Sequence, residues 1–208
     1  NDRLTSENGQ GYAYDNNGNL LSQPDGTTYQ YDAENRLIQA QPPAGIVKYT
    51  YDADGVRVQA VAGGVTTAYL VDKNRRYSQV LEERNASGTL LASNVFGHGL
   101  IRRQQGATGA YYHYDGQRSV RQLTDVNGAV TDSYVYDGFG ALLDRAGVST
   151  NPYLYAGEEF DAHLGQYYLR ARYYQPELGR FLTVDPVVGV PSEPRTLNRY
   201  AYAWNDPI

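Results

Sequence analysis

Runs of residues that alternate between apolar and polar positions follow one another along most of the chain, and turn-forming residues separate them. Tyr49 and Tyr51, for example, flank a polar threonine and are followed by Asp52 and Gly55. An alternation of this kind places every second side chain on the same face of a β-strand. Apolar residues spaced three and four apart, which indicate helices, extend over no long window of the sequence. The pattern predicts an all-β fold built from short strands.

A four-residue motif, Tyr-x-Tyr-Asp, recurs along the first two thirds of the chain. Successive aspartates lie 17, 20, 20, 43 and 22 residues apart, and the longest interval fits two periods with an eroded copy near residues 96–99. A fixed short period is typical of a repeat architecture. The complete copies are Tyr12, Tyr14 and Asp15; Tyr29, Tyr31 and Asp32; Tyr49, Tyr51 and Asp52; Tyr112, Tyr114 and Asp115; and Tyr134, Tyr136 and Asp137, with a degenerate copy at Tyr69, Val71 and Asp72.

The aspartate of each copy marks the end of a strand and the start of a turn. Its carboxylate can accept hydrogen bonds from backbone N–H groups, and a residue that tolerates positive φ stands three positions later. Apolar residues of a returning strand come next, so each copy predicts a β-hairpin. The residues at the turn position are Gly18, Asn35, Gly55 and Gly140, whereas the Asp115 copy departs from the rule with Arg118.

Composition identifies tyrosine as the main core residue. The chain of 208 residues has 21 tyrosines, against 4 phenylalanines and 1 tryptophan. Tyrosine favours strands, and it has a large apolar body with a hydroxyl that needs a partner when buried. We expect the paired rings to pack between neighbouring hairpins. The alternative is a carbohydrate-stacking surface, as in a glycan-binding adhesin.

The sequence excludes several classes of site and partner. Cysteine and methionine are absent, which excludes disulfides and thiolate sites and indicates a segment of a longer polypeptide. His98, His113 and His163 are too far apart in sequence to suggest a metal site, and we expect no cofactor. The net charge of −5, without a block of like charges, argues against nucleic-acid binding. No apolar run is long enough to span a membrane.

The last third of the chain contains an ordered series of motifs. Together with the Tyr-Asp repeats, this series resembles the Rhs/YD-repeat family and its core-associated region, and the resemblance covers essentially the whole chain. Similar proteins include bacterial polymorphic toxins, Tc-toxin C components and the teneurins. The motifs are Gly157-Glu-Glu-Phe-Asp161, Tyr168-Leu-Arg-Ala-Arg-Tyr-Tyr174, Pro176-Glu-Leu-Gly-Arg-Phe181, Asp185-Pro186 and Asn198-Arg-Tyr-Ala-Tyr202.

The resemblance implies a curved, spiralling sheet of consecutive hairpins that is part of a hollow shell. It divides the chain into a hairpin array, 1–144, and a plug, 145–208, and implies a non-catalytic scaffold that encapsulates a C-terminal toxin or effector domain. The implied partners are the upstream repeats and the downstream domain of the parent chain, with glycan or cell-surface contact as a further candidate. The implied location is secreted or cell-surface.

The number of copies limits how much of a shell this chain can form. Five or six hairpins give ten to twelve strands, which at about 4.8 Å between neighbours span roughly 50–60 Å. Such a sheet curls only partway around a cavity. We expect its first strand to leave an open edge near Asn1, which a preceding hairpin would cover in the parent chain.

Two residues of the plug are candidates for catalysis. In the segment 166–174, period two places Arg170, Arg172 and the neighbouring tyrosines on one face, which suits stacking on rings and pairing with Asp185. Pro186 favours an extended conformation of Asp185. The pair Arg172–Asp185 predicts a partly buried ion pair that locks the plug. By the resemblance, the same two residues match the Arg and Asp of an aspartic-protease-like site that cleaves its own chain beyond residue 208.

Such cleavage requires two carboxyl groups. One activates water while the other, protonated, polarises the scissile carbonyl. Asp161 and Asp206 are the candidates for the second carboxyl. The stretch 187–197 is longer than the linker typical of self-cleaving members, so the scaffold is the first hypothesis and self-cleavage the alternative.

Overall fold

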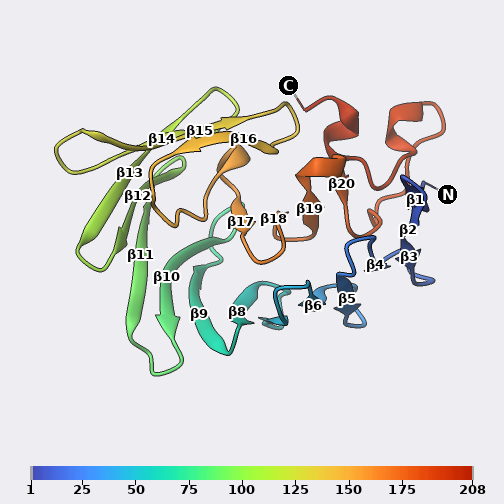
Figure 1. The fold of residues 1–208 in the computed structure, drawn as a ribbon, viewed down its shortest axis with the longest axis horizontal. Coiled ribbons are helices and arrows are strands. Elements are labelled where there is room, and N and C mark those ends of the chain that lie inside the picture. Colours follow the sequence, from blue (N-terminus) through green and yellow to red (C-terminus); the bar gives the residue numbers. More distant parts are fainter. Residues whose placement is uncertain (1, 208) are drawn as a thin grey trace.

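A computed structural model of the chain describes residues 2–207 and confirms an all-β architecture with three antiparallel sheets (Figure 1). A short hairpin, β1 (Ser6–Glu7) and β2 (Gln10–Gly11), precedes the main sheet. The main sheet contains β3 (Ala13–Tyr14), β4 (Leu20–Ser22), β5 (Thr28–Tyr31), β6 (Leu37–Gln41), β7 (Val47–Tyr51), β8 (Arg57–Ala62), β9 (Val65–Asp72), β10 (Gln79–Asn85), β11 (Leu90–Phe96), β12 (Leu100–Gln105), β13 (Thr108–Tyr114), β14 (Val120–Thr124), β15 (Val130–Tyr136) and β16 (Leu142–Ala146).

The last third of the chain forms a small sheet and four short 3-10 helices. These elements are η1 (Tyr155–Gly157), β17 (Glu159–Asp161), β18 (Gln166–Tyr168), β19 (Tyr173–Gln175), η2 (Pro176–Leu178), β20 (Arg180–Phe181), η3 (Pro194–Thr196) and η4 (Tyr202–Asn205). We call the segment 147–207 the plug. The main sheet ends at Ala146. The division of the chain into a hairpin array, 1–144, and a plug region, 145–208, stays a prediction.

In the main sheet, every strand from β3 to β16 pairs with its neighbours in the sequence. Figure 1 shows this sheet bending around the plug. The sheet is open, and one of its edges is β3, as expected near the start of the chain. It has 14 strands, so the expected ten to twelve was too low. The uncounted hairpin is β11–β12, whose turn at residues 97–99 lacks the Tyr-Asp motif.

The turn chemistry predicted for the motif is confirmed at every complete copy. Asp52 is typical: its Oδ1 accepts hydrogen bonds from the N–H groups of Asp54 (3.0 Å) and Val56 (2.9 Å), and Gly55 has a φ of 78°. Arg118 takes the same conformation with a φ of 68°, so its turn keeps the geometry at a cost in backbone strain. The other motif aspartates that accept equivalent backbone bonds are Asp15, Asp32, Asp115 and Asp137.

The plug docks on the rim that these turns form. Tyr167 and Tyr200 donate their hydroxyls to the carbonyls of Gly140 (3.0 Å) and Gly18 (2.8 Å). Both glycines have positive φ, and a Cβ at Gly140 would lie 2.5 Å from the Tyr155 ring. A glycine at this position therefore allows the positive φ of the hairpin turn, and its lack of a Cβ lets the plug approach closely.

Two hydrophobic clusters join the plug to the main sheet, one near each end of it. The first contains Leu20, Tyr29, Leu37, Ala40, Val47 and Tyr49 from β4–β7, with Tyr168, Tyr173 and Leu182 from the plug. The second contains Leu100, Tyr112, Val120, Leu123, Tyr134 and Tyr136 from β12–β15, with Tyr153, Leu154, Tyr155, Tyr167 and Tyr174 from the plug. The main sheet therefore has its core on the side that faces the plug.

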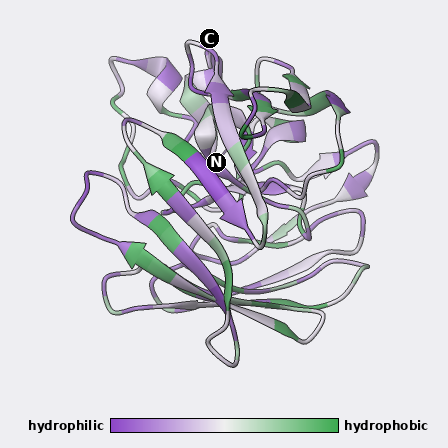
Figure 2. Ribbon diagram, turned by 90° about the vertical axis from the view of Figure 1, so that its left-hand side faces the viewer, coloured by the Kyte–Doolittle hydropathy of each residue, from purple (hydrophilic) through white to green (hydrophobic). Residues whose placement is uncertain are grey.

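The opposite face of the main sheet carries exposed apolar residues between polar ones, as period two requires. Val65, Leu70, Val95 and Val130 are each more than half exposed. Figure 2 shows hydrophobic and hydrophilic stretches alternating along the strands. The motif tyrosines therefore lie on the inner side of the sheet, whereas the outer side carries exposed aliphatic residues.

The expected strand over residues 166–174 is wrong. The chain folds back on itself between β18 and β19, so that Tyr167 pairs with Tyr174 and Tyr168 with Tyr173. Arg170 sits in this turn with a φ of 61°, which breaks the period-two alternation. The side chains expected on one face are consequently separated.

Candidate functional site at the seam between sheet and plug

The tyrosine pairs of the motif line the inner side of the main sheet. In three of the five complete copies the second tyrosine donates its hydroxyl to the preceding hairpin, as Tyr51 does to the carbonyl of Leu37 (2.8 Å) and Tyr136 to that of Val120 (2.9 Å). Tyr114 makes the same bond to the carbonyl at position 100 (2.6 Å). The first tyrosine is 3–7% exposed in four copies, at Tyr29, Tyr49, Tyr112 and Tyr134.

The rings contact each other within a motif and contact rings of the plug. Tyr134 and Tyr136 stack at 6.5 Å between ring centres, and Tyr136 meets Tyr155 of the plug edge-on at 5.9 Å. The rings also pack between hairpins, as expected: the guanidinium of Arg36 lies 5.3 Å from the centre of the Tyr51 ring of the next hairpin, and that of Arg121 lies 5.4 Å from the centre of the Tyr136 ring. Burial raises the pKa of the phenols, to about 12 for Tyr114 and Tyr155. Tyr14 packs in the same way against Tyr200.

Arg172 and Asp185 form the predicted ion pair, with 2.7 Å between Nη2 and Oδ2. The guanidinium lies 3.6 Å from the centre of the Phe181 ring, and the other carboxylate oxygen, Oδ1, accepts the N–H of Val187 (2.9 Å). Burial lowers the pKa of Arg172, and Asp185 opposes that effect. Arg199 donates to the backbone carbonyl of Asp185 and closes the loop between them. The pair ties the turn before β19 to the segment after β20.

The arrangement around Asp185 suits an anchor or a base better than a proton donor, because both of its oxygens accept hydrogen bonds. The candidate Asp161 is engaged elsewhere: its Oδ2 accepts the hydroxyl of Tyr49 (2.5 Å) and its Oδ1 the N–H of His163 (3.0 Å). Asp206, the other candidate, is exposed near the end of the chain. The role of Arg172 and Asp185 in catalysis stays a prediction.

Arg170 does not join this pair. It forms an ion pair with Glu158 (2.7 Å) and donates from Nε to the carbonyl of Ser78 (3.2 Å) on the rim of the main sheet. The two arginines of the motif thus serve different contacts. Arg172 is internal to the plug, whereas Arg170 connects the plug to the sheet.

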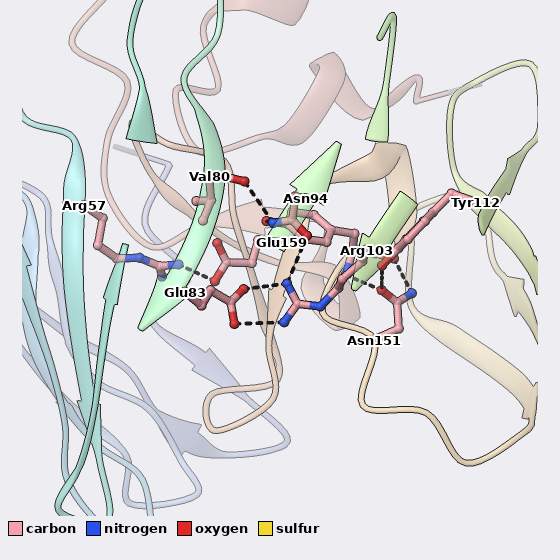
Figure 3. A network of polar contacts seen from close by, with 9 residues as sticks. Arg57, Val80, Glu83, Asn94, Arg103, Tyr112, Asn151 and Glu159 are labelled. Carbon is pink, nitrogen blue, oxygen red and sulfur yellow. Dashed lines mark hydrogen bonds and ion pairs between the residues drawn. The ribbon is translucent and has the colours of Figure 1, made fainter. Parts of the chain in front are cut away.

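A group of charged and amide side chains crosses the middle of the seam (Figure 3). We call it the polar band, and its sheet members are Arg57, Glu83, Asn94 and Arg103. Strands β8, β10, β11 and β12 place these side chains on the inner face. Sequence reasoning did not single them out.

Arg57 is the most enclosed member of the polar band. It is 3% exposed, lies 4.1 Å from the centre of the Tyr168 ring, and donates from Nη1 to the Tyr173 hydroxyl (2.9 Å). Its charge is balanced by an ion pair with Glu159 of the plug. Burial raises the pKa of Glu159, and the Arg57 guanidinium opposes that effect. The pair joins β8 to β17.

Arg103 holds the other half of the polar band. It contacts both carboxylate oxygens of Glu83, at 2.7 and 2.8 Å, and donates to Oδ1 of Asn94 (3.2 Å). Asn94 in turn donates to the carbonyl of Val80 (2.9 Å) and lies 3.4 Å from the Tyr153 hydroxyl of the plug. Glu83 and Arg103 are 20 residues apart, one repeat length, and that spacing was the one available signal.

The described residues contain no candidate metal site. Among residues 2–207, no three His, Asp or Glu side chains are grouped so as to hold a metal ion. The ring of His113 contacts the hydroxyl of Thr124 (3.0 Å). In the same range of residues, no helix has the length and apolar character needed to traverse a bilayer.

Comparisons with known proteins agree on one family. The family profile described as Teneurin YD-shell matches residues 1–208. The tRNA3(Ser)-specific nuclease WapA of Bacillus spizizenii is 34% identical over 215 residues, which cover 99% of this chain and 9% of that protein. Toxin protein Tse5 of Pseudomonas aeruginosa is 36% identical over 98 residues, 47% of this chain and 7% of its own length. The chain thus spans less than a tenth of these relatives.

Solved structures share the fold. The Tc holotoxin pore of Photorhabdus luminescens with the mutation TccC3-D651A superposes with a TM-score of 0.71 at 20% identity, over 91% of this chain and 10% of that one. The complex TcdB2-TccC3-Cdc42 gives a TM-score of 0.69 over the same shares. At this identity the likeness supports the shell architecture of the sheet and plug.

Proposed function

The chain belongs to the teneurin YD-shell family, and from this premise we propose that it forms the last hairpins and the plug of an Rhs-type shell that encapsulates a C-terminal toxin or effector domain of a longer parent chain. One observation carries the proposal: the plug covers the inner face of the main sheet through two hydrophobic clusters and the polar band. Such a contact closes one end of a shell. The relatives WapA and Tse5 are named as a nuclease and a toxin, which supports a toxic cargo.

Limited proteolysis of the parent chain with its native downstream domain tests encapsulation. We expect that domain to resist protease when the plug is intact, because a closed wall excludes the enzyme. Replacing Tyr155 and Tyr174 with alanine removes two buried rings that fix the plug and should expose the domain to rapid cleavage. The matched control replaces Val187 and Val188, both more than 70% exposed, and should leave the resistance unchanged. Equal digestion of the downstream domain in all three proteins would refute encapsulation.

Partners and location follow from the same proposal. Among residues 2–207 no further strand pairs with the open edge at β3, and we propose that upstream repeats of the parent continue the sheet there. We further propose that the parent is exported, either secreted or held at the cell surface. A carbohydrate-binding function has weaker support, because the tyrosine pairs that would form its platform are largely covered by the plug.

Self-cleavage is a second candidate function, and the Arg172–Asp185 pair supports it. A chain extended past residue 208 by its native residues should yield two fragments, and Asp185→Asn should abolish the cut. Asp161→Asn and Asp206→Asn identify which carboxyl, if either, cooperates with Asp185. A normal rate of cleavage in Asp185→Asn, measured by mass spectrometry of the fragments, would eliminate this function and leave encapsulation untouched.

A further inference from the structure

A cavity of about 560 Å³ opens where the plug meets the two degenerate repeats. Its walls come from the β9–β10 loop at residues 73–78, the β11–β12 turn at residues 97–99, the Asp115–Arg118 turn, and plug residues around Tyr153 and Arg170. This volume lies within the range of about 300–1,000 Å³ that is typical of small-molecule sites.

The cavity coincides with the two degenerate copies of the repeat. Complete copies place a second tyrosine at the end of the strand, and its ring and hydroxyl fill the seam, as Tyr136 does. At the same position β9 has Val71 and β11 has Phe96, and both line the cavity. Neither side chain has a hydroxyl, and valine leaves most of the volume of a ring unfilled.

The lining of the cavity is strongly cationic, although the chain as a whole has a net charge of −5. Five arginines face two glutamates there: Arg57, Arg75, Arg76, Arg118 and Arg170 against Glu158 and Glu159. The glutamates pair with Arg170 and Arg57, and Arg75 lies 3.5 Å from Asp72.

Two of these arginines have no acidic partner. Within residues 2–207, neither Arg76 nor Arg118 forms an ion pair, and the buried Nε of Arg57 has no hydrogen-bond partner. Arg76 and Arg118 come from different walls of the cavity, the β9–β10 loop and the Asp115–Arg118 turn. The guanidinium group matches carboxylate and phosphate in geometry and charge.

We propose that this cavity is a binding site for a small polyanion, a ligand that carries two or more carboxylate or phosphate groups. Arg76 and Arg118 contact its charged groups from two different walls, and Tyr77, Phe96 and Tyr114 provide apolar contact for its body. The site is separate from Arg172 and Asp185, which do not line it. All of its lining residues belong to this chain, so the site can be tested without the proposed C-terminal domain of the parent.

Isothermal titration calorimetry of the 208-residue chain with citrate and with inorganic pyrophosphate tests the site and distinguishes the two anion chemistries. We expect one ligand per chain, with affinity that falls as salt concentration rises. Arg118→Gly removes one guanidinium and should weaken binding about tenfold. The same change relieves a positive φ, so the variant should be at least as stable as the natural chain, and loss of binding cannot be attributed to unfolding.

A second variant tests the volume instead of the charge. Val71→Tyr restores the motif tyrosine and should fill the cavity, so that binding is lost while all five arginines remain. Arg145→Gln is the matched control, because Arg145 is exposed on β16, donates to the carbonyl of Ser149 (3.0 Å), and forms no ion pair with the described residues. The proposal is overturned if neither anion binds, if a glutamate-rich peptide binds but the small anions do not, or if Arg118→Gly and Val71→Tyr bind as tightly as the control.

Discussion

The main sheet holds the plug in two different ways. At its two ends, β4–β7 and β12–β15, tyrosine and aliphatic side chains pack on the plug. The hairpins in these two regions have complete Tyr-Asp motifs. Between them, β8–β12 meets the plug with the polar band, and the motifs on β9 and β11 are degenerate. The repeat therefore docks the plug as well as forming hairpins, and in the region of the degenerate copies the contact with the plug depends on the polar band.

The two modes have different physical consequences. Apolar contact is additive and non-directional, so it tolerates adjustment of the plug. A buried ion pair such as Arg57–Glu159 depends on both partners, because either charge alone is costly to bury. The two regions can therefore be disrupted separately: alkaline pH acts on the tyrosine regions, and a single charge-removing substitution acts on the polar band.

The largest expected effect is alkaline unfolding, which acts on the tyrosine regions. An exposed tyrosine ionises near pH 10, whereas burial raises the pKa of Tyr114 and Tyr155 to about 12 in the folded chain. The stability that these phenols contribute is complete below about pH 10 and is lost as the pH rises toward 12. Circular dichroism and tyrosinate absorbance should therefore change together in one cooperative step. Ionisation of the buried tyrosines without a change in circular dichroism would contradict the assigned role of the phenols.

The second largest effect is expected from a substitution that disrupts the polar band. Glu159→Gln leaves the charge of Arg57 buried without a partner and should lower the free energy of unfolding by about 3 kcal/mol. The double variant Arg57→Met with Glu159→Leu removes both charges and should be close to the natural chain in stability. Glu34→Gln, which removes an exposed partner of Arg36, is the control and should cost less than about 0.5 kcal/mol. Urea denaturation measures all three, and an equal loss for Glu159→Gln and Glu34→Gln would show that the band contributes little.

The same division separates what the sequence can and cannot predict. The hairpins, the turns and the aromatic packing depend on a local motif whose chemistry repeats, and they are visible in the sequence. The Arg57–Glu159 pair joins residues 102 positions apart on elements that have no shared motif, so only the folded chain brings them together. The prediction of one strand through Arg170 was wrong for a local reason. Arg170 has a left-handed backbone conformation, which ends the strand although the alternation of side chains continues in the sequence.

A smaller effect compares two motif tyrosines that differ in one hydrogen bond. Tyr136 donates its hydroxyl to the carbonyl of Val120, whereas the buried hydroxyl of Tyr31 has no partner within residues 2–207. Tyr136→Phe should therefore destabilise the chain by about 1 kcal/mol, and Tyr31→Phe should leave its stability unchanged or raise it slightly. Thermal unfolding of the two variants measures the difference. Equal destabilisation by both would show that the hydroxyl bonds to the preceding hairpin do not hold the array together.

An effect of about the same size concerns the one complete repeat with an unfavourable turn residue. Arg118 has a φ of 68° where the other complete copies have glycine or asparagine, so Arg118→Gly should raise the free energy of unfolding by about 1 kcal/mol. Gly128→Ala is the mirror experiment: Gly128 has a φ of 82°, and a Cβ there would meet no atom within 4 Å, so only backbone strain changes. It should destabilise the chain by a similar amount. If Arg118→Gly instead destabilises the chain while Gly128→Ala behaves as expected, the arginine side chain stabilises the seam by more than its backbone strain costs.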